Sequence, residues 1–236
     1  MKTHTFTGLI INKIKFPTSL KKLNENWAYS LRDLTEIEVS PNNPYLIYYD
    51  NKYLLGKSDE SNDKFGILYY SRFDIEEAVI PRQVTIIKPN PFDGHKKLKS
   101  VTFPGNSMLK RIEDYPFSGS TLEKLGIPAS LEQIGEKWLL FCSIFEIKVP
   151  PKNKVFKILN EKCLLAMSDP KSCIFDTLLF GRRDIESVLI PSNIKVIEAS
   201  AFDCCTNLKN IFFLNQDHLS KISNTLDFPP FKVKRK

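Results

Sequence analysis

Apolar and polar residues alternate in short runs along this chain, and most of the runs end in proline. The phrase apolar-x-x-apolar-x-apolar-Pro occurs four times, at 75–81, 98–104, 122–128 and 185–191, and weaker copies end at Pro17, Pro41 and Pro150. Alternation predicts short strands with one buried face, and proline ends each strand because it has no N–H to donate to a ladder. We therefore expect parallel strands of one curved sheet, listed along the chain as 10–16, 35–40, 75–80, 98–103, 122–127, 145–149, 185–190 and 208–213.

A longer repeat contains this short one. Residues 36–103 align with 146–213 at a constant offset of 110 without a gap, and 11 of the 30 positions between 74–103 and 184–213 are identical. Such periodicity is the signature of a solenoid, in which each coil buries its apolar face only against its neighbours. We expect the two halves to have the same topology.

Large residues follow the prolines at regular spacing, and two stretches break the short period. We expect the aromatic residues to be buried as plugs between coils; they are Trp27, Phe92, Phe117, Trp138 and Phe202.

The stretches 42–70 and 152–180 match each other, and each predicts strand, tight turn, strand, polar loop and third strand. The turns fall near Asp50-Asn51 and Asn160-Glu161, and the loops 56–66 and 166–176 should be the most exposed and mobile segments.

The repeat unit resembles the leucine-rich repeats of the BspA-like surface-antigen family. The best copy is 185–208, with Ala201-Phe202, Cys205 and Leu208 in the family pattern, whereas Pro91-Phe92 and Pro116-Phe117 depart from its Ala-Phe pair. The resemblance implies a mainly β solenoid with a parallel sheet on the concave face and short helical or 3-10 turns on the back. It also implies a surface or adhesion protein that contacts host, matrix or other cell proteins.

Composition fits a single folded solenoid over 1–228, followed by a basic tail over 229–236. The net charge is +7, but Lys232, Lys234, Arg235 and Lys236 supply four of these charges, so a solvated, frayed tail is favoured over a nucleic-acid site. The N-terminus has no hydrophobic run typical of a signal peptide, and no stretch is apolar enough for membrane insertion. The family resemblance implies a cell-surface or extracellular location, with the cytoplasm as the alternative.

Candidate chemistry is sparse. The three histidines, His4, His95 and His218, are far apart, and the five cysteines form no C-x-x-C pair, so we expect no metal, no cofactor and no enzymatic activity. Cys142, Cys204 and Cys205 fall near the cysteine position of the repeat and are expected to be buried.

The remaining candidate is a surface. Outward-facing positions of the strands form two rows, and repeat proteins commonly bind partners on such faces. We take as candidate partner-binding residues Lys15, Glu38, Val79, Thr102, Lys124, Lys148, Leu189 and Phe212. Leu189 and Phe212 form an apolar pair that is either a partner site or ground covered by the C-terminal segment, which carries Leu219, Ile222, Leu226 and Phe228. The alternatives to protein binding are a self-associating structural solenoid and an intracellular scaffold.

Overall fold

The computed structural model describes residues 6, 9–29, 31–57, 61, 63–169, 171–214, 221–222 and 232–235. The chain divides into two units, one formed by Met1–Leu122 and Ser130–Cys142 and the other by Glu123–Ala129 and Ser143–Lys236. Each unit is described separately below.

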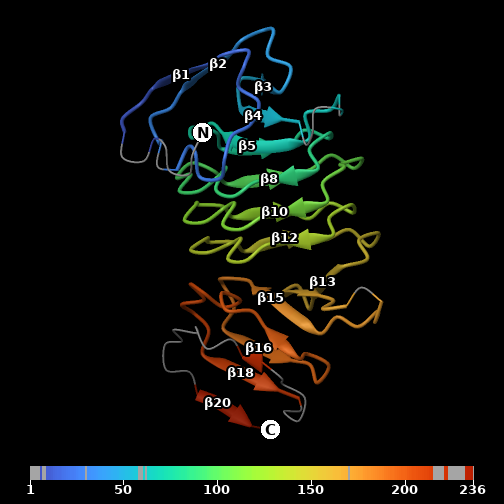
Figure 1. Ribbon diagram of the computed structural model, residues 1–236. Helices are drawn as coiled ribbons and strands as arrows, with labels where there is room; N and C mark the ends of the chain where they lie inside the picture. Colours follow the sequence, from blue (N-terminus) through green and yellow to red (C-terminus); the bar gives the residue numbers. More distant parts are fainter. Residues whose placement is uncertain are drawn as a thin grey trace. The chain divides into compact units, whose positions relative to one another are not determined.

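The proline-terminated phrases form the front strands of the solenoid. All eight expected strands are present and slightly shorter than predicted: β1 (Lys13–Phe16), β2 (Glu36–Val39), β6 (Glu77–Val79), β8 (Ser100–Thr102), β10 (Lys124–Gly126), β12 (Glu146–Lys148), β16 (Ser187–Ile190) and β18 (Asn210–Phe213). Within the first unit β1 pairs with β2 and β6 with β8, and within the second β10 pairs with β12 and β16 with β18. Every one of these pairs is parallel, as predicted (Figure 1).

The prediction of one continuous front sheet is wrong. In the first unit β1 and β2 form a sheet of their own, separate from the sheet that contains β6 and β8. In the second unit β12 and β16 likewise belong to different sheets. The front sheet is interrupted where the two long stretches insert extra strands. Those strands join a second sheet, so among the described residues no strand pairs with the second edge of β2, whose first edge pairs with β1, or of β12, whose first edge pairs with β10.

The inserted stretches fold as predicted. The first contains β3 (Leu46–Tyr49), β4 (Tyr53–Gly56) and β5 (Ile67–Ser71), and the second contains β13 (Phe156–Leu159), β14 (Cys163–Ala166) and β15 (Thr177–Gly181). Both hairpins turn through two residues with positive φ, 51° and 53° at Asp50-Asn51 and 47° and 58° at Asn160-Glu161, as type I′ turns require. Each strand of the first stretch begins and ends 110 residues before its equivalent in the second stretch, so the two halves share one topology here.

Irregularities of the two halves also coincide. The register of the β4–β5 pair shifts between Leu54 and Leu55, and that of β14–β15 shifts between Leu164 and Leu165. The carboxamide oxygen of Asn43 accepts the N–H groups of Tyr45 and Leu46, and its NH₂ group donates to the Pro17 carbonyl at 2.7 Å. The equivalent Asn153 makes the same set of bonds around the start of β13. Duplication therefore preserved the bulges and the turn chemistry together with the strands.

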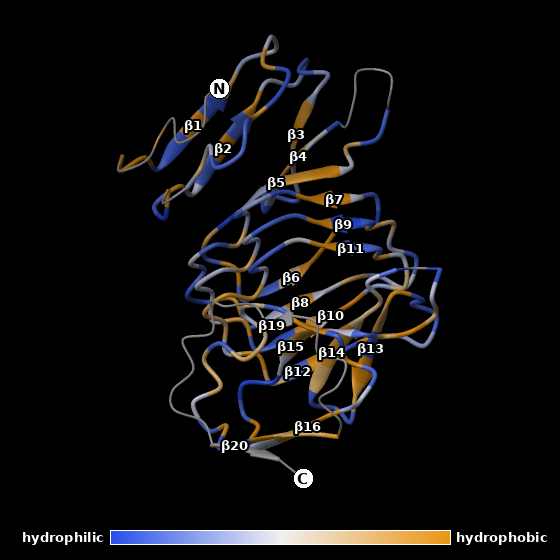
Figure 2. Ribbon diagram, turned by 60° about the horizontal axis from the view of Figure 1, so that its bottom comes forward, coloured by the Kyte–Doolittle hydropathy of each residue, from blue (hydrophilic) through white to orange (hydrophobic). Residues whose placement is uncertain are grey.

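A second sheet takes the place of the helical turns that the family resemblance implied. The described residues contain no helix, and the chain turns through short strands: β7 (Ile86–Ile87), β9 (Arg111–Ile112) and β11 (Gln133–Ile134) in the first unit, and β17 (Val196–Ile197) and β19 (Lys221–Ile222) in the second. These strands continue the inserted ones, so the first unit has the order β11-β9-β7-β5-β4-β3. Figure 2 shows β5 and β7 in hydrophobic colours, whereas β1 and β2 are largely hydrophilic.

The aromatic plugs are buried, as predicted. Phe92 and Phe117 are fully buried and stack with ring centroids 5.3 Å apart, and Trp27, Trp138 and Phe202 are at most 5% exposed. Residues with left-handed backbone flank the plugs: Asn26, Asn90, Tyr115 and Lys137 precede them, and Gly94, Gly119, Phe141 and Cys204 follow them. The backbone therefore turns sharply on both sides of Phe92, Phe117 and Trp138, before Trp27 and after Phe202.

Phe141 occupies a position at which two other coils have glycine. Its φ of 57° is strained for a phenylalanine, and its side chain is 64% exposed. We expect Phe141→Gly to raise the free energy of unfolding by about 0.5–1 kcal/mol, because relief of left-handed strain exceeds the entropic cost of glycine. Urea denaturation measures the change. Phe141→Ala keeps the Cβ atom and should bring no gain, and a destabilised glycine variant would show that the ring contributes to packing.

The basic end of the chain is not a frayed tail. β20 (Lys232–Arg235) pairs in parallel with β18, so that residues 232–235 form a further front strand of the second unit. The expectation that the tail is frayed is therefore wrong for residues 232–235. Leu219, Leu226 and Phe228 lie outside the described residues, and Leu189 is 44% exposed while Phe212 is half-buried.

Candidate binding surface

The outward-facing side chains of the front strands are exposed. Buried and exposed residues alternate along β2, β6 and β16, as a strand with one packed face requires. Of the eight candidate residues seven are exposed and Phe212 is half-buried. Six of the eight candidate residues form neighbouring pairs, and the eight do not form one unbroken row because the front sheet is interrupted. Lys15 lies beside Glu38, Val79 beside Thr102, and Leu189 beside Phe212.

Charged residues cluster on the strands that precede the insertions. On β1 and β2 the Lys13 ammonium lies 2.6 Å from the Glu38 carboxylate, and Lys15 lies 3.5 Å from it. On β10 and β12 the Glu146 carboxylate lies 2.6 Å from Lys148 and 3.7 Å from Lys124. Hydrogen bonds from Lys13 and from Lys148 hold the pKa values of Glu38 and Glu146 below their ordinary range. Exposed pairs of this kind contribute little to stability and leave the charges available to a partner.

Apolar residues occupy the strands that follow the insertions. Val79 is 60% exposed in the middle of β6, and Leu189, its equivalent at an offset of 110, is 44% exposed in the middle of β16. Thr102 and Phe212 lie beside them on the next strands. Each half therefore presents a charged patch before its insertion and an exposed aliphatic side chain after it.

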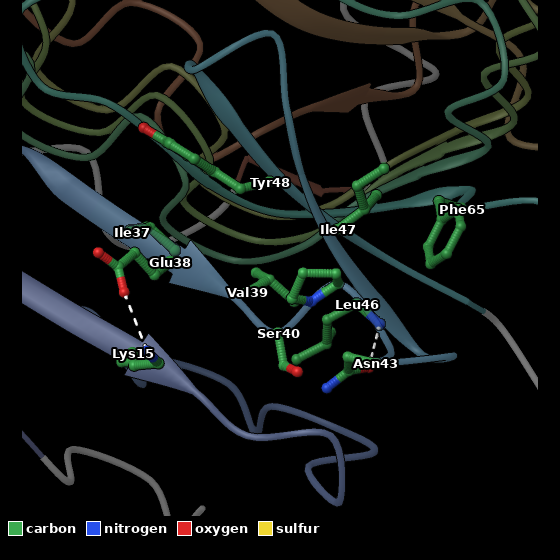
Figure 3. Close-up of a pocket in the computed structure, with 11 residues that line it drawn as sticks. Lys15, Ile37, Glu38, Val39, Ser40, Asn43, Leu46, Ile47, Tyr48 and Phe65 are labelled. Atoms are coloured by element: carbon green, nitrogen blue, oxygen red, sulfur yellow. Dashed lines mark hydrogen bonds and ion pairs between the residues drawn. The ribbon is translucent and has the colours of Figure 1, made fainter.

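A groove lies beside β2 in the first unit. It has a volume of about 680 Å³, and its lining includes Lys15 and Glu38 of the candidate set together with Ile37 to Pro41, Asn43, Leu46, Ile47, Tyr48 and Phe65. Figure 3 shows Val39 and Ser40 on the β2 side, Leu46 and Ile47 on the β3 side, and Phe65 near Ile47. Sequence reasoning missed Ile47, Tyr48 and Phe65. The available signal was the apolar run 45–49, which lacks the polar alternation expected of a strand with one solvated face.

The insertion loops are only partly described. Residues 58–60, 62 and 170 lie outside the described residues. In the second loop the Asp176 carboxylate is buried and accepts hydrogen bonds from the backbone and hydroxyl of Ser168, and Lys195 lies 3.4 Å from it. The described base of this loop is therefore anchored to the second sheet.

His95 packs in the interior of the first half. His95 is fully buried, stacks on Phe73 at 4.1 Å between ring centroids, and faces the carbonyl oxygens of Ser71 and Asp93 at 3.2 and 3.3 Å. Burial lowers the pKa of His95 to about 4, so the ring is neutral at pH 7. No group of three potential metal ligands is found among the described residues, and His4 and His218 lie outside them.

The second half has different residues at the position of His95. Its equivalent is Cys205, and the Phe73 equivalent is Arg183, whose guanidinium donates to the carbonyls of Gly181 and Ala201 and lies 3.6 Å from the Cys205 sulfur. Burial raises the pKa of the Cys205 thiol, as expected for a structural cysteine. Cys142 and Cys205 are buried as predicted, whereas Cys204 is exposed, so the prediction of a buried Cys204 is wrong.

Comparisons with known proteins agree with the architecture. The profile of a family described as BspA type leucine-rich repeat region matches residues 1–51, 66–174 and 153–226, in six copies. No curated protein shows significant sequence similarity to the chain. Within the described residues there is no helix long and apolar enough to span a membrane.

Solved structures of bacterial proteins have a similar fold. The pneumococcal vaccine antigen PcpA matches with a TM-score of 0.58 and 18% identity over 90% of this chain and 48% of its own. A leucine-rich repeat protein of Eubacterium ventriosum matches with a TM-score of 0.57 and 21% identity, over 85% and 48%. A leucine-rich cell surface protein of Faecalibacterium prausnitzii gives 0.55 and 16%, over 88% and 56%. The chain thus spans about half the length of these structures, and at this identity the similarity concerns the fold alone.

Proposed function

Because the chain belongs to the BspA-type leucine-rich-repeat family, we propose that it is a non-enzymatic module that binds a protein partner through its front strands at the cell surface. The observation that carries the proposal is the exposure of an aliphatic residue at the same position of each half, Val79 on β6 and Leu189 on β16, each on a strand with a parallel neighbour. Exposed apolar side chains on a rigid face, next to charged ones, are typical of protein interfaces. Two of the similar structures are described as a vaccine antigen and a cell surface protein, which supports the location.

Photo-crosslinking identifies the partner. A photoreactive amino acid at position 79 or 189 is irradiated in the presence of intact cells or purified matrix proteins, and crosslinked products are identified by mass spectrometry. The same residue at position 97, an exposed position in the bend that precedes β8 and outside the front strands themselves, is the control. Surface labelling of the producing cell tests the location, and its failure would favour the intracellular scaffold. Crosslinks only between copies, with a dimer mass in light scattering, would favour the self-associating solenoid.

Variants of the front strands should separate binding from stability. With the crosslinked partner, we expect Val79→Ala with Thr102→Ala, or Lys124→Glu with Lys148→Glu, to lower the affinity by about tenfold or more. These side chains are exposed, so unfolding free energies should change by no more than about 0.5 kcal/mol. Deletion of residues 58–64 should leave the affinity nearly unchanged. Calorimetry and denaturation measure the two quantities, with Lys97→Glu as the control. If the front-strand variants leave the affinity unchanged and the loop deletion lowers it, the binding site lies in the insertion loops.

A further inference from the structure

β2 has one edge without a strand partner among the described residues. The N–H of Glu36 donates to Asn12 and that of Ser40 to Phe16, both on the β1 side. In a parallel ladder successive residues point their N–H and C=O groups to opposite edges, so those of Ile37 and Val39 face away from β1. β2 pairs only with β1, and no hydrogen bond between described residues reaches these groups. The edge therefore offers a free donor and acceptor pattern to an incoming strand.

The strands on the other side of each insertion have their free edges blocked. The hydroxyl of Tyr53, which comes from the inserted hairpin, lies close enough to the backbone of Val79 on β6 to influence the pKa of the phenol. In the second half the ammonium of Lys162, from the equivalent hairpin, donates to the carbonyl of Ser187 on β16 at 3.2 Å. Unpaired strand edges invite pairing with other chains, and folded proteins commonly obstruct them with polar side chains. The β2 edge has no such obstruction within the described residues.

The free edge of β2 opens onto the groove described above. Ile37, Val39 and Ser40 line the β2 wall, and Ile47 lies on the β3 wall with 37% of its surface exposed (Figure 3). Phe65, half-buried, adds an aromatic surface. A strand added beside β2 would direct alternate side chains into this groove and the others to solvent. The groove can therefore hold the apolar side chains that an extended peptide directs to one side of its backbone, at every second residue.

The second half has a charged residue at the position equivalent to Ile47. Lys157 stands where the first half has Ile47, and its ammonium lies 5.7 Å from the centroid of the Phe175 ring, the equivalent of Phe65. Lysine is a common obstruction of strand edges. In the first half the ammonium of Lys57 lies 5.5 Å from the centroid of the Phe65 ring, so a cation lies over the ring in both halves. The difference between the halves is that an apolar Ile47 lines the groove where the second half has Lys157.

We propose that β2 binds an extended segment of a partner protein as an added strand, with apolar side chains of that segment seated against Ile47 and Phe65. This proposal rests on the proposed function, since it assumes that the module binds protein, and it names a second contact with its own chemistry. Main-chain hydrogen bonds to Ile37 and Val39 provide affinity, and the groove provides selectivity. The alternating donors and acceptors of the edge match an extended polypeptide and not a folded surface or a nucleic acid.

The test uses a random peptide library displayed on phage and selected on the whole chain. We expect selected peptides to carry alternating apolar residues and to lose about tenfold or more in affinity for Ile47→Lys, which introduces the residue found in the second half. The converse variant Lys157→Ile is the matched control and should leave their affinity unchanged. Methylation of the backbone nitrogens of every second peptide residue should abolish binding when these are the residues whose N–H groups face β2. Methylation of the intervening residues should be tolerated, because their N–H groups point away from β2.

Three outcomes would overturn the proposal. The first is that no peptide is selected. The second is that the affinity of the selected peptides is unchanged by Ile47→Lys, and the third is that methylation lowers the affinity equally at both alternate sets of peptide residues. Circular dichroism of Ile47→Lys establishes that the variant is folded, and Ile47→Thr, which keeps β-branching and charge neutrality, should give a smaller loss. Crosslinking at positions 79 and 189 remains an independent readout, so failure of the β2 site leaves the proposed function standing. Absence of crosslinks together with intact peptide binding would exclude only the contact at Val79 and Leu189.

Discussion

Replacement of Phe92 with alanine is expected to lower the free energy of unfolding by about 3–5 kcal/mol. The ring is fully buried, stacks on Phe117 at 5.3 Å and contacts the His95 ring at 5.5 Å between centroids. Removing it leaves a cavity between consecutive coils, and the left-handed residues Asn90 and Gly94 on either side limit how far the chain can collapse to fill it. Urea denaturation followed by tryptophan fluorescence measures the loss.

The damage should spread along the solenoid. Each coil is stabilised mainly by its neighbours, so hydrogen exchange should accelerate in β6 and β8 as well as in the mutated turn. Phe141→Ala is the matched control, since the same substitution at an exposed phenylalanine should change stability by no more than about 0.5 kcal/mol. A Phe92→Ala protein with an unchanged melting temperature would exclude this ring from the core.

Acid should destabilise the protein through His95 before its carboxylates titrate. The pKa of His95 is about 4 in the folded chain because the ring is buried, against 6.5 for an unperturbed histidine. Between these values the unfolded chain binds a proton that the folded chain does not, so stability falls as the pH is lowered from 6.5 to 4. A difference of this size corresponds to about 3 kcal/mol, present in full above pH 6.5 and lost near pH 4.

His95→Cys is the test variant, because cysteine occupies the equivalent position 205. The thiol is neutral throughout the acid range, so the variant should have a flatter dependence of unfolding free energy on pH between 6.5 and 4.5, although its stability at pH 7 is expected to be lower. Burial raises the pKa of Asp93, and protonation of this carboxyl opposes acid destabilisation and does so in both proteins. Equal slopes for His95→Cys and the unaltered chain would show that another group controls acid stability.

Sequence patterns predicted the front strands well because the same physical requirement repeats in every coil. Alternation over three or four residues followed by proline fixes which face is buried, and the register of β6 with β8 follows from that alternation. The inserted hairpins were predictable for a different reason. Asp50-Asn51 and Asn160-Glu161 lie between apolar runs, and the two halves align without a gap through both turns.

Features that depend on contacts between distant segments could not be predicted in this way. The interruption of the front sheet depends on which sheet the inserted strands join, and a strand pattern does not specify its partner. The groove beside β2 is lined by residues of both β2 and β3, so the exposure of Ile47 became evident only in three dimensions. Alternation did predict that Lys15 and Glu38 face outward, but not that they line this groove. The short strands β7, β9 and β17 contain only two residues each, too few to show a period.

The two halves differ at three interior positions that contact one another. The effect of a substitution at one of these positions is therefore expected to depend on the residues at the other two. Ser71, Phe73 and His95 of the first half correspond to Gly181, Arg183 and Cys205 of the second, and in each half the three positions are in contact. A guanidinium at position 73 would lie against an imidazole, and a serine at position 181 would place its Cβ 2.6 Å from the ring of Phe202. We therefore expect the residues at positions 73 and 181 to be exchanged between the halves only together with their contact partners, and a recombination breakpoint that separates them to lower the stability of the chain.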